Sequence, residues 1–193
     1  MKGNSFIIRI EMQITVHNTP TQLEGKEIRL AQEAPAARVL ELGGAQNVIG
    51  MIAPNVQLLI AIPSLKTEVC SLGAKKFNEM MQNYKNVTTV MVTTDDEVFL
   101  EEYLRSQPLE HAKLFRDEER QFGKKYGVLI GEGKLKNRLA RAVFIVDKEG
   151  IVRYKEIVSE ITDEVDYAAC MQALEEVLGA KKKAHVHENW MRA

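Results

Sequence analysis

The sequence predicts one α/β domain, in which a central mixed sheet is flanked by helices and preceded by an N-terminal β-hairpin. Short, nearly continuous apolar runs alternate with segments of helical periodicity, as in sheets whose parallel strands are joined by helices. Before these runs, residues 6–16 have apolar side chains at alternate positions, which is the period of a half-buried strand. The length of 193 residues, with 45% hydrophobic residues, suits one domain that buries its own core.

The N-terminal hairpin is expected over about residues 6–30. Residues 6–16 alternate as one strand, residues 17–21 carry a turn signal, and residues 22–30 return as the second strand. The following segment, residues 31–49, contains a proline and a glycine pair and is expected to be mostly loop.

Four further apolar runs predict strands, at residues 56–62, 87–93, 142–146 and 151–157. The first is apolar almost throughout, which indicates a strand covered on both faces. The last two are separated by the turn signal at residues 147–150, so they are expected to pair as an antiparallel hairpin.

Helices are expected between these strands and at the end of the chain. Apolar spacing predicts a helix over about residues 67–84. A second helix starts after the capping signal Asp95-Asp96 and ends by Pro108. Residues 115–126 are expected to be helical or irregular. A last helix, capped by Asp163 or Asp166, is expected to run to about Leu178 and to stop at Gly179.

The element order matches the thioredoxin architecture, in which parallel strands joined by helices are followed by an antiparallel hairpin and a final helix. The expected organisation is a single domain over residues 1–180 and a flexible tail over residues 181–193. Two tail histidines, His185 and His187, are more typical of a solvated tail than of a metal site. A fold of this kind does not define a function, which depends on particular residues.

Composition excludes several classes of partner. The formal net charge is −1, so no strong basic or acidic bias points to nucleic acid, a membrane or a polyanionic substrate. No apolar run reaches the length of a membrane span, and the stretch at residues 6–8 is too short for a signal peptide. Two distant cysteines form no disulfide framework, so a reducing compartment, the cytoplasm, is expected. Neither zinc-ligand spacing nor a glycine-rich phosphate loop is present, so no metal or other cofactor is expected.

Cys70 is the candidate reactive residue. It is expected early in the helix that follows a buried strand, where the macrodipole and free N–H groups favour a thiolate. Thr67 lies one helical turn earlier, where its hydroxyl can donate to the sulfur. Pro63 shapes the preceding loop and has no N–H to leave unpaired. The alternative interpretations are an inert core cysteine for Cys70 and an ordinary N-cap for Thr67.

The run Pro63-x-x-x-Thr67-x-x-Cys70 resembles the active-site signature of peroxiredoxins. The surrounding residues are similar to one branch, the bacterial thiol peroxidases of the atypical two-cysteine type, and the resemblance covers about residues 14–178. Its matching positions are residues 77–79, 126–128, 139–144, 147 with 150, 158–160 and 166–167, together with the hairpin at residues 18–25.

The resemblance implies an antioxidant oxidoreductase of thioredoxin-like fold that reduces hydrogen peroxide or an alkyl hydroperoxide. Cys70 would be the peroxidatic cysteine and pass through sulfenic acid. Thr67 would orient the peroxide, Pro63 would shield the sulfur, and Arg141 would stabilise thiolate and transition-state charge. Without the resemblance, Arg141 would be interpreted as a surface charge at the start of a strand. The electrons would come from thioredoxin or another thiol, and a homodimer is implied.

One departure from this branch concerns the second half of the catalytic cycle. These peroxidases keep a resolving cysteine on the helix after the second buried strand, but residues 95–108 contain none, and Arg105 or Ser106 stands at the matching place. Three explanations remain: a one-cysteine enzyme reduced by an external thiol, a cysteine replaced by Ser106, or resolution by Cys170.

Cys170 itself is expected to be structural. It belongs to an apolar helical stripe, where a free cysteine behaves as a small hydrophobic residue. The last helix is also expected to pack on the sheet face away from Cys70. A second function therefore stays open: a thioredoxin-fold protein that senses peroxide or binds a partner without sustained turnover.

Overall fold

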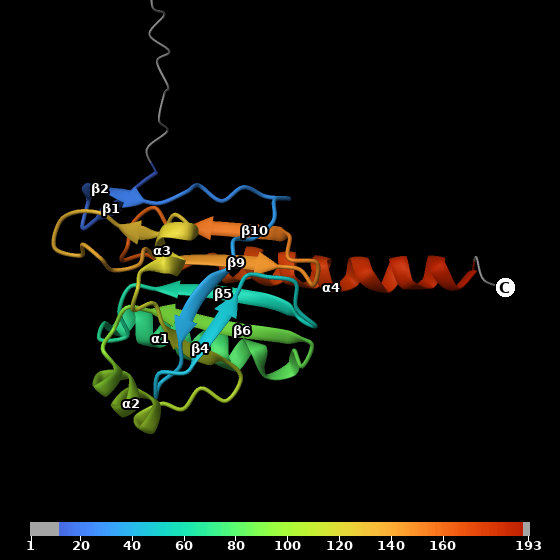
Figure 1. The fold of residues 1–193 in the computed structure, drawn as a ribbon, viewed down its shortest axis with the longest axis horizontal. Helices are drawn as coiled ribbons and strands as arrows, with labels where there is room; N and C mark the ends of the chain where they lie inside the picture. The colour runs from blue at the N-terminus through green and yellow to red at the C-terminus, as the bar shows by residue number, and fades with distance from the viewer. Residues whose placement is uncertain (1–11, 191–193) are drawn as a thin grey trace, which may run out of the picture.

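A seven-stranded mixed sheet forms the centre of the molecule, in a computed structural model that describes residues 12–190, with side chains to Gly179 (Figure 1). The strands are β1 (Gln13–Val16), β2 (Thr19–Glu24), β3 (Ala37–Leu40), β4 (Gln46–Ile49), β5 (Val56–Ile62), β6 (Val87–Thr93), β7 (Lys113–Arg116), β8 (Leu129–Ile130), β9 (Ala142–Val146) and β10 (Val152–Ile157). The helices are α1 (Glu68–Met80), the 3-10 turn η1 (Met81–Asn83), α2 (Glu97–Ser106), α3 (Gln121–Lys125) and α4 (Tyr167–Trp190).

The strand order in the central sheet is β10-β9-β5-β6-β7-β3-β4. β6 is parallel to both β5 and β7, whereas β9 runs antiparallel to β5 and β10 antiparallel to β9. All seven residues of β5 are buried because the strand has neighbours on both sides and covered faces above and below. The mixed sheet and its flanking helices confirm the predicted fold class.

Two hydrophobic clusters lie on opposite faces of this sheet. One cluster joins β5, β6 and β9 to α1, α2 and α4, and includes Phe77, Leu100 and Leu174. The other joins the sheet to the small sheet β1-β2-β8 and to α3, and includes Ile14 and Phe122. Each face of the central sheet is therefore covered by a separate layer, and a hydrophobic core lies on each side of the sheet.

The topology brings three functional segments to one edge of the sheet. β5 and β6 are parallel, so the residues that follow them, Pro63 and Asp95, leave the sheet at the same edge. β9 runs in the opposite direction and pairs Ala142 with Ala61, so Arg141, just before β9, also lies at this edge. Residues far apart in the sequence meet there because of strand direction.

The segment at residues 31–49, expected to be mostly loop, instead contains the hairpin β3–β4, so that expectation is wrong. Gly43 and Gly44 have φ angles of +91° and +87°, which glycine adopts without strain, and they make the turn. Ala37 and Val39 alternate inward along β3 and reach the core. A second missed strand, β7, begins at Lys113 and overlaps the first two residues of the stretch expected to be helical or irregular, whereas α3 lies within that stretch as expected.

The last helix is longer than expected. α4 continues through Gly179 to Trp190, so the predicted stop at Gly179 is wrong and the residues assigned to a flexible tail from 181 are helical up to Trp190 (Figure 1). Gly179 does not take the positive φ of a terminating glycine. The alanines and lysines that follow it are strong helix formers, which favours continuation.

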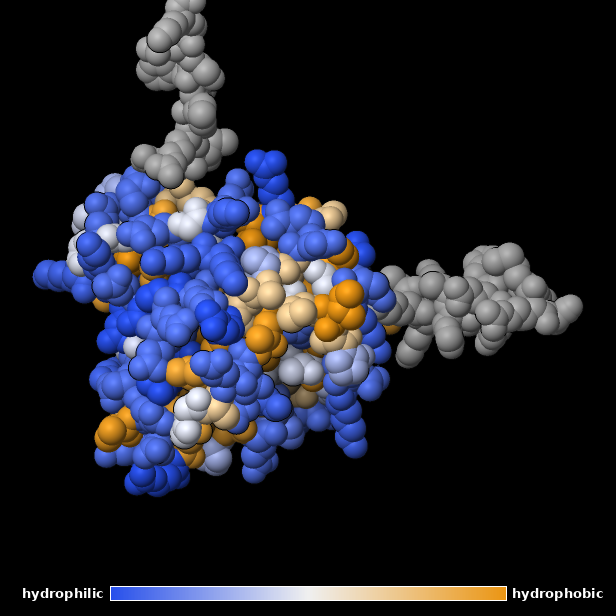
Figure 2. All heavy atoms as spheres, viewed as in Figure 1, coloured by the Kyte–Doolittle hydropathy of each residue, from blue (hydrophilic) through white to orange (hydrophobic). Residues whose placement is uncertain are grey.

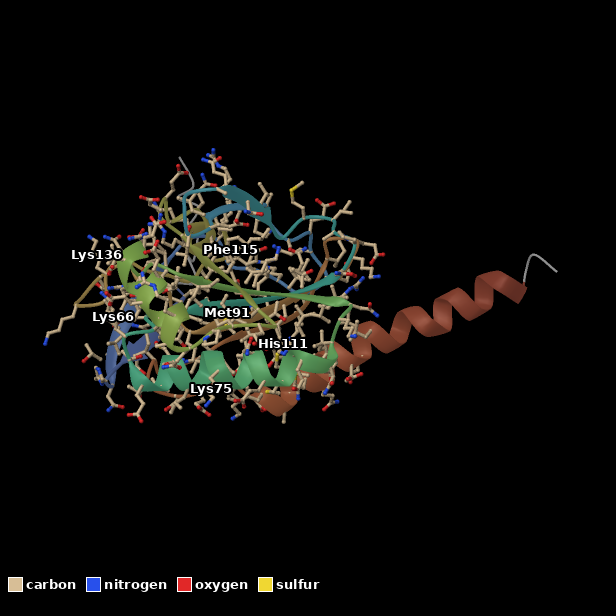
Figure 3. The ribbon with its side chains drawn as sticks, turned by 90° about the horizontal axis from the view of Figure 1, so that it is seen from below. Lys66, Lys75, Met91, His111, Phe115 and Lys136 are labelled. Atoms are coloured by element: carbon tan, nitrogen blue, oxygen red, sulfur yellow. The ribbon has the colours of Figure 1, made fainter. Side chains whose placement is uncertain are left out.

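α4 also packs on a different face from the one expected. Cys170 and Leu174 belong to the same cluster as Cys70 and Phe77, so α4 and α1 share one face of the sheet. The Phe77 and Tyr167 rings lie 5.0 Å apart, and Figure 3 shows both helices below the sheet, α1 carrying the labelled Lys75. The opposite face was not available because β1, β2, β8 and α3 already cover it.

An N-terminal hairpin is confirmed for the described residues, where β1 pairs antiparallel with β2. Its bounds differ from those expected: the turn is only His17-Asn18, and the second strand spans Thr19–Glu24 instead of residues 22–30. Residues 6–11 of the expected first strand lie outside the described part. Among residues 12–190, no helix has both the length and the apolar content needed to cross a membrane. His185 and His187 lie outside the range of described side chains, within which no cluster of His, Cys, Asp and Glu is placed to hold a metal ion.

Candidate active site

Cys70 lies in the first turn of α1, at the sheet edge where β5 ends. Thr67 is the N-cap residue, with extended backbone angles, and the first helical hydrogen bond runs from Ser71 N to Thr67 O. The amide groups of residues 68–70 therefore precede the helical ladder and contribute to the positive end of the helix. The Cys70 side chain is almost fully enclosed, with the residue 2% exposed.

Arg141 is the direct partner of the cysteine. Its Nη2 lies 3.4 Å from Cys70 Sγ and also donates to the carbonyl oxygen of Ile161 at 3.1 Å. Arg141 is 7% exposed, and its Nε has no hydrogen-bond partner among the described residues. A buried guanidinium with a donor to spare beside a sulfur is suited to binding a further oxygen or developing negative charge there.

The Ile161 carbonyl that holds Arg141 is itself fixed by the N-terminal hairpin. Thr15 N donates to Ser159 O at 2.6 Å, and Ile161 N donates to Thr15 O at 3.0 Å. Glu160, between them, accepts hydrogen bonds from the backbone N–H groups of His17 and Asn18. The hairpin thus supports the segment that positions the guanidinium.

Thr67 and Pro63 complete the predicted set. Pro63 is buried directly after β5, and Thr67 is exposed. The Thr67 hydroxyl donates to Ser64 O at 3.1 Å, so in this state its hydrogen is not directed at the sulfur. With its proton engaged, the Thr67 oxygen can act as a hydrogen-bond acceptor for a bound molecule.

Two tyrosines that the sequence analysis did not assign to the site flank it. Burial raises the pKa of Tyr167 to about 12; the nearby charges of Glu164 and Cys70 add to this rise, and the charge of Arg141 opposes it. Burial also raises the pKa of Tyr103, opposed by the Ser71 hydrogen bond and reinforced by the charge of Cys70. Both phenols therefore stay protonated at neutral pH. Tyr103 follows the spacing of its helix, but no local signal indicated that it would meet α1.

A groove of about 1040 Å³ lies beside the site, between α1 and α2. Thr67 and Ser71 line it from the α1 side, and Tyr103, Ser106 and Gln107 from the α2 side. Ser71 Oγ lies 3.2 Å from Tyr103 Oη and 3.2 Å from Gln107 Oε1, so polar groups bridge the two helices. On the α1 side the lining extends along the helix from Thr67 to Glu79.

The three residues considered in connection with a resolving thiol, Arg105, Ser106 and Cys170, lie in different environments. Ser106 lines the groove and donates to Tyr103 O at 2.9 Å, whereas the Arg105 side chain is 73% exposed and pairs with Glu101. Cys170 is 0% exposed, and burial, with Glu156 and Asp166 nearby, raises the pKa of its thiol to about 12. Both cysteines are free thiols, and Cys170 has the properties of a core residue.

Comparison with known proteins agrees with this geometry. The sequence model of the Redoxin family matches residues 30–171. A thiol peroxidase of Aquifex aeolicus is 36% identical over 165 residues, covering 86% of this chain and 98% of that protein. The chain belongs to the thiol peroxidases. A thiol peroxidase of Leptospira interrogans is likewise 36% identical over 166 residues, with 83% and 96% coverage.

Solved structures place the thiol peroxidase fold of this chain among the peroxiredoxins. A peroxiredoxin-like protein from Aquifex aeolicus superposes with a TM-score of 0.82 at 37% identity, covering 86% of this chain and 96% of that one. A thiol peroxidase from Chromobacterium violaceum gives a TM-score of 0.78 at 18% identity, which supports the fold alone. The expected thioredoxin-like, peroxiredoxin fold is confirmed.

Proposed function

We propose that this thiol peroxidase reduces hydrogen peroxide or alkyl hydroperoxides with Cys70 as the peroxidatic cysteine. The observation that carries the proposal is the 3.4 Å contact between Arg141 Nη2 and Cys70 Sγ in the first turn of α1. A guanidinium and a helix N-terminus both stabilise negative charge on sulfur, and the thiolate is the nucleophilic form of cysteine.

In the first step, the Cys70 thiolate attacks the terminal oxygen of the peroxide. An S–O bond forms while the O–O bond breaks, so that Cys70 becomes a sulfenic acid and the other oxygen leaves as hydroxide or alkoxide, which takes up a proton from water. Sulfur is oxidised and the peroxide is reduced by two electrons. The unpartnered Nε of Arg141 is available to stabilise charge on the breaking O–O bond.

Thr67 and Pro63 serve the same step. The Thr67 oxygen accepts the O–H of the incoming peroxide, because its own proton is already donated to Ser64 O. Pro63 is buried directly after β5, and its role in the proposal is to limit access of water to the sulfur with a ring that has no N–H. Together with Arg141 they align the peroxide for attack.

The second step uses an external thiol, from thioredoxin or another reductant. The described α2 carries no cysteine, so a resolving thiol is not supplied from the helix that borders the groove. A first external thiol condenses with the sulfenic acid to a mixed disulfide and releases water, and a second thiol releases Cys70 as a disulfide between the two external sulfurs. The open groove between α1 and α2 is the approach route.

Two broader expectations belong to the same proposal. A cytoplasmic location is supported by the two free cysteines, since reduced thiols persist in reducing compartments. A homodimer that joins the active-site ends is supported by exposed apolar side chains there, Leu72 on α1 and Val98 on α2, which are 54% and 69% exposed.

The deciding experiment follows peroxide consumption with thioredoxin and its reductase, and records intact mass after one equivalent of peroxide. Wild type and Cys170→Ala are expected to gain one oxygen on Cys70 and to turn over, whereas Cys70→Ser is expected to be inactive. Peroxide reduction by Cys70→Ser at the wild-type rate would overturn the proposal. Rapid oxidation of Cys70 without turnover by any thiol reductant would instead identify a peroxide sensor.

A further inference from the structure

Asp95 is a fully buried carboxylate at the sheet edge that carries the site. It follows β6 directly, its side chain is 0% exposed, and the neighbouring Asp96 performs the capping of α2 by accepting from Phe99 N. Asp95 is therefore not needed to start that helix. A buried charge is costly unless it is paired and hydrogen-bonded, so its partners indicate what it does.

Both oxygens of Asp95 are engaged by three separate segments. Oδ1 accepts from Ser64 Oγ at 2.8 Å and from Arg138 Nη1 at 2.6 Å. Oδ2 accepts from Leu65 N at 2.7 Å and from Thr93 Oγ1 at 3.3 Å. The carboxylate thus joins the β5–α1 loop, the end of β6 and the segment before β9.

Two of these segments carry the reacting groups. Ser64 and Leu65 lie in the loop that leads through Thr67 to Cys70, and Arg138 lies three residues before Arg141. Figure 3 shows Lys66 and Lys136, neighbours of these two segments, at the same end of the molecule, opposite the extension of α4. Asp95 is the described side chain that bonds to both segments at once.

We propose that Asp95 is a positioning residue for peroxide reduction, which holds the Cys70 loop and the Arg141 segment at their working separation. The inference rests on the proposed function of Cys70. The link between Arg141 and Cys70 is a single 3.4 Å contact, so a small shift of either segment weakens it. Misplacement of a reacting group by about 1 Å costs about 100-fold in rate.

The test compares Asp95→Asn with the matched control Asp96→Asn, whose carboxylate is exposed and pairs with Lys66. Two second-order rate constants are measured for Cys70, one with hydrogen peroxide and one with iodoacetamide. Iodoacetamide needs the thiolate but has no O–O bond to be polarised by Arg141. Asp95→Asn is expected to lower the peroxide constant by about 10- to 100-fold and the iodoacetamide constant far less, while Asp96→Asn changes neither.

The double variant Asp95→Asn, Arg138→Gln separates positioning from general destabilisation. If Asp95 acts through Arg138, the second substitution adds little to the loss caused by the first. Ser64→Ala removes one of the four contacts and is expected to change the same ratio of rate constants in the same direction, which keeps the test usable if Asp95→Asn does not fold.

Equal losses in the peroxide and iodoacetamide constants, or a wild-type peroxide constant for Asp95→Asn, would show that Asp95 does not position the reacting groups. A different result would contradict the proposed function itself. In that case Cys70 would react with peroxide no faster than a free cysteine, both in the wild type and in the Asp95 variant.

Discussion

Cys70 and Arg141 form a pair of almost fully enclosed groups, 2% and 7% exposed, joined by one contact between guanidinium and sulfur. The guanidinium is anchored on its other side by the Ile161 carbonyl, so its position relative to the sulfur is defined at two points. An arginine held in this way presents a planar set of donors that a lysine cannot reproduce.

Arg141→Lys is expected to lower the rate constant of Cys70 with hydrogen peroxide by about 100-fold, because one ammonium cannot contact sulfur, Ile161 O and peroxide together. Stopped-flow oxidation of the reduced protein measures this constant. Arg105→Lys is the control, since the Arg105 side chain is 73% exposed and pairs only with the surface residue Glu101 among described groups. A loss confined to Arg105→Lys would contradict the assigned role of Arg141.

At the scale of secondary-structure elements, two helices and a hairpin determine how the site is supported. α1 begins at the active site and packs through Phe77 on Tyr167, at the start of α4. Lys76 lies 3.6 Å from the Tyr167 ring centroid and 3.5 Å from Glu164 Oε2, which adds a charged contact across the same junction. The junction closes the face of α1 that carries Cys70.

Gly179→Ala tests the continuation of α4. A Cβ at Gly179 meets nothing within 4 Å, so alanine is expected to stabilise the helix by up to about 1 kcal/mol. Gly73→Ala is the matched comparison in α1: its Cβ would lie 3.1 Å from Tyr167 Oη and 3.9 Å from Arg141 Nη1, which offsets the gain. Urea unfolding measures both. Destabilisation by Gly179→Ala would support a helix that ends at this glycine.

The contacts between Glu160 and the N-terminal hairpin predict that the stability of the protein depends on pH. Hydrogen bonds from Asn18 N, Thr15 and His17 N hold the pKa of Glu160 at about 2, below the ordinary 4.5. Because the folded-state pKa is lowered, this stabilisation is complete above pH 4.5 and is lost as the pH falls toward about 2.

Urea unfolding of wild type and Glu160→Gln across this pH range tests the dependence. The difference in unfolding free energy is expected to be constant above pH 5 and to close between about pH 4.5 and 2. Glu79→Gln, at an exposed position on α1, is the control and should show no such closing. A pH-independent difference for Glu160→Gln would exclude the carboxylate as the source.

At the scale of the whole molecule, the site exists because loops from β5, β6 and β9 emerge at one edge of the sheet. The opposite edge carries the β9–β10 turn, where Gly150 lies against Met51 and Ile52. Figure 2 shows hydrophobic side chains gathered near the end of the body from which α4 extends, and Ile52 is 80% exposed. Exposed apolar groups are thus present at both ends.

The proposed dimer interface can be tested by substituting an exposed apolar residue at each of these two ends. Leu72→Asp places a charge at the active-site end and is expected to convert a dimer into monomers, because a buried unpaired charge opposes association. Ile52→Asp, at the opposite end, is expected to leave the dimer intact. Sedimentation velocity at several concentrations measures both. Dissociation by Ile52→Asp alone would place the interface at the other end, and a monomeric wild type would remove it.

Much of the fold could be predicted from local patterns. The continuous apolar runs at residues 56–62 and 142–146, and the segment at residues 151–157 after the turn, indicated strands, which the structure confirms. The hairpin β3–β4 was missed because its strands are short and its glycine pair resembles a loop. The end of α4 was misjudged because a glycine can lie within a helix as well as terminate it.

For this thiol peroxidase, sequence by itself determined the strands and helices, the placement of Cys70 at a strand–helix junction, and the family signature around it. Only the tertiary structure decided that Arg141, 71 residues away, contacts the sulfur, that Asp95 bonds to Arg138 across 43 residues, and that α4 shares a face with α1. Secondary structure follows from near neighbours in the chain, whereas these contacts depend on the direction and order of strands in the sheet.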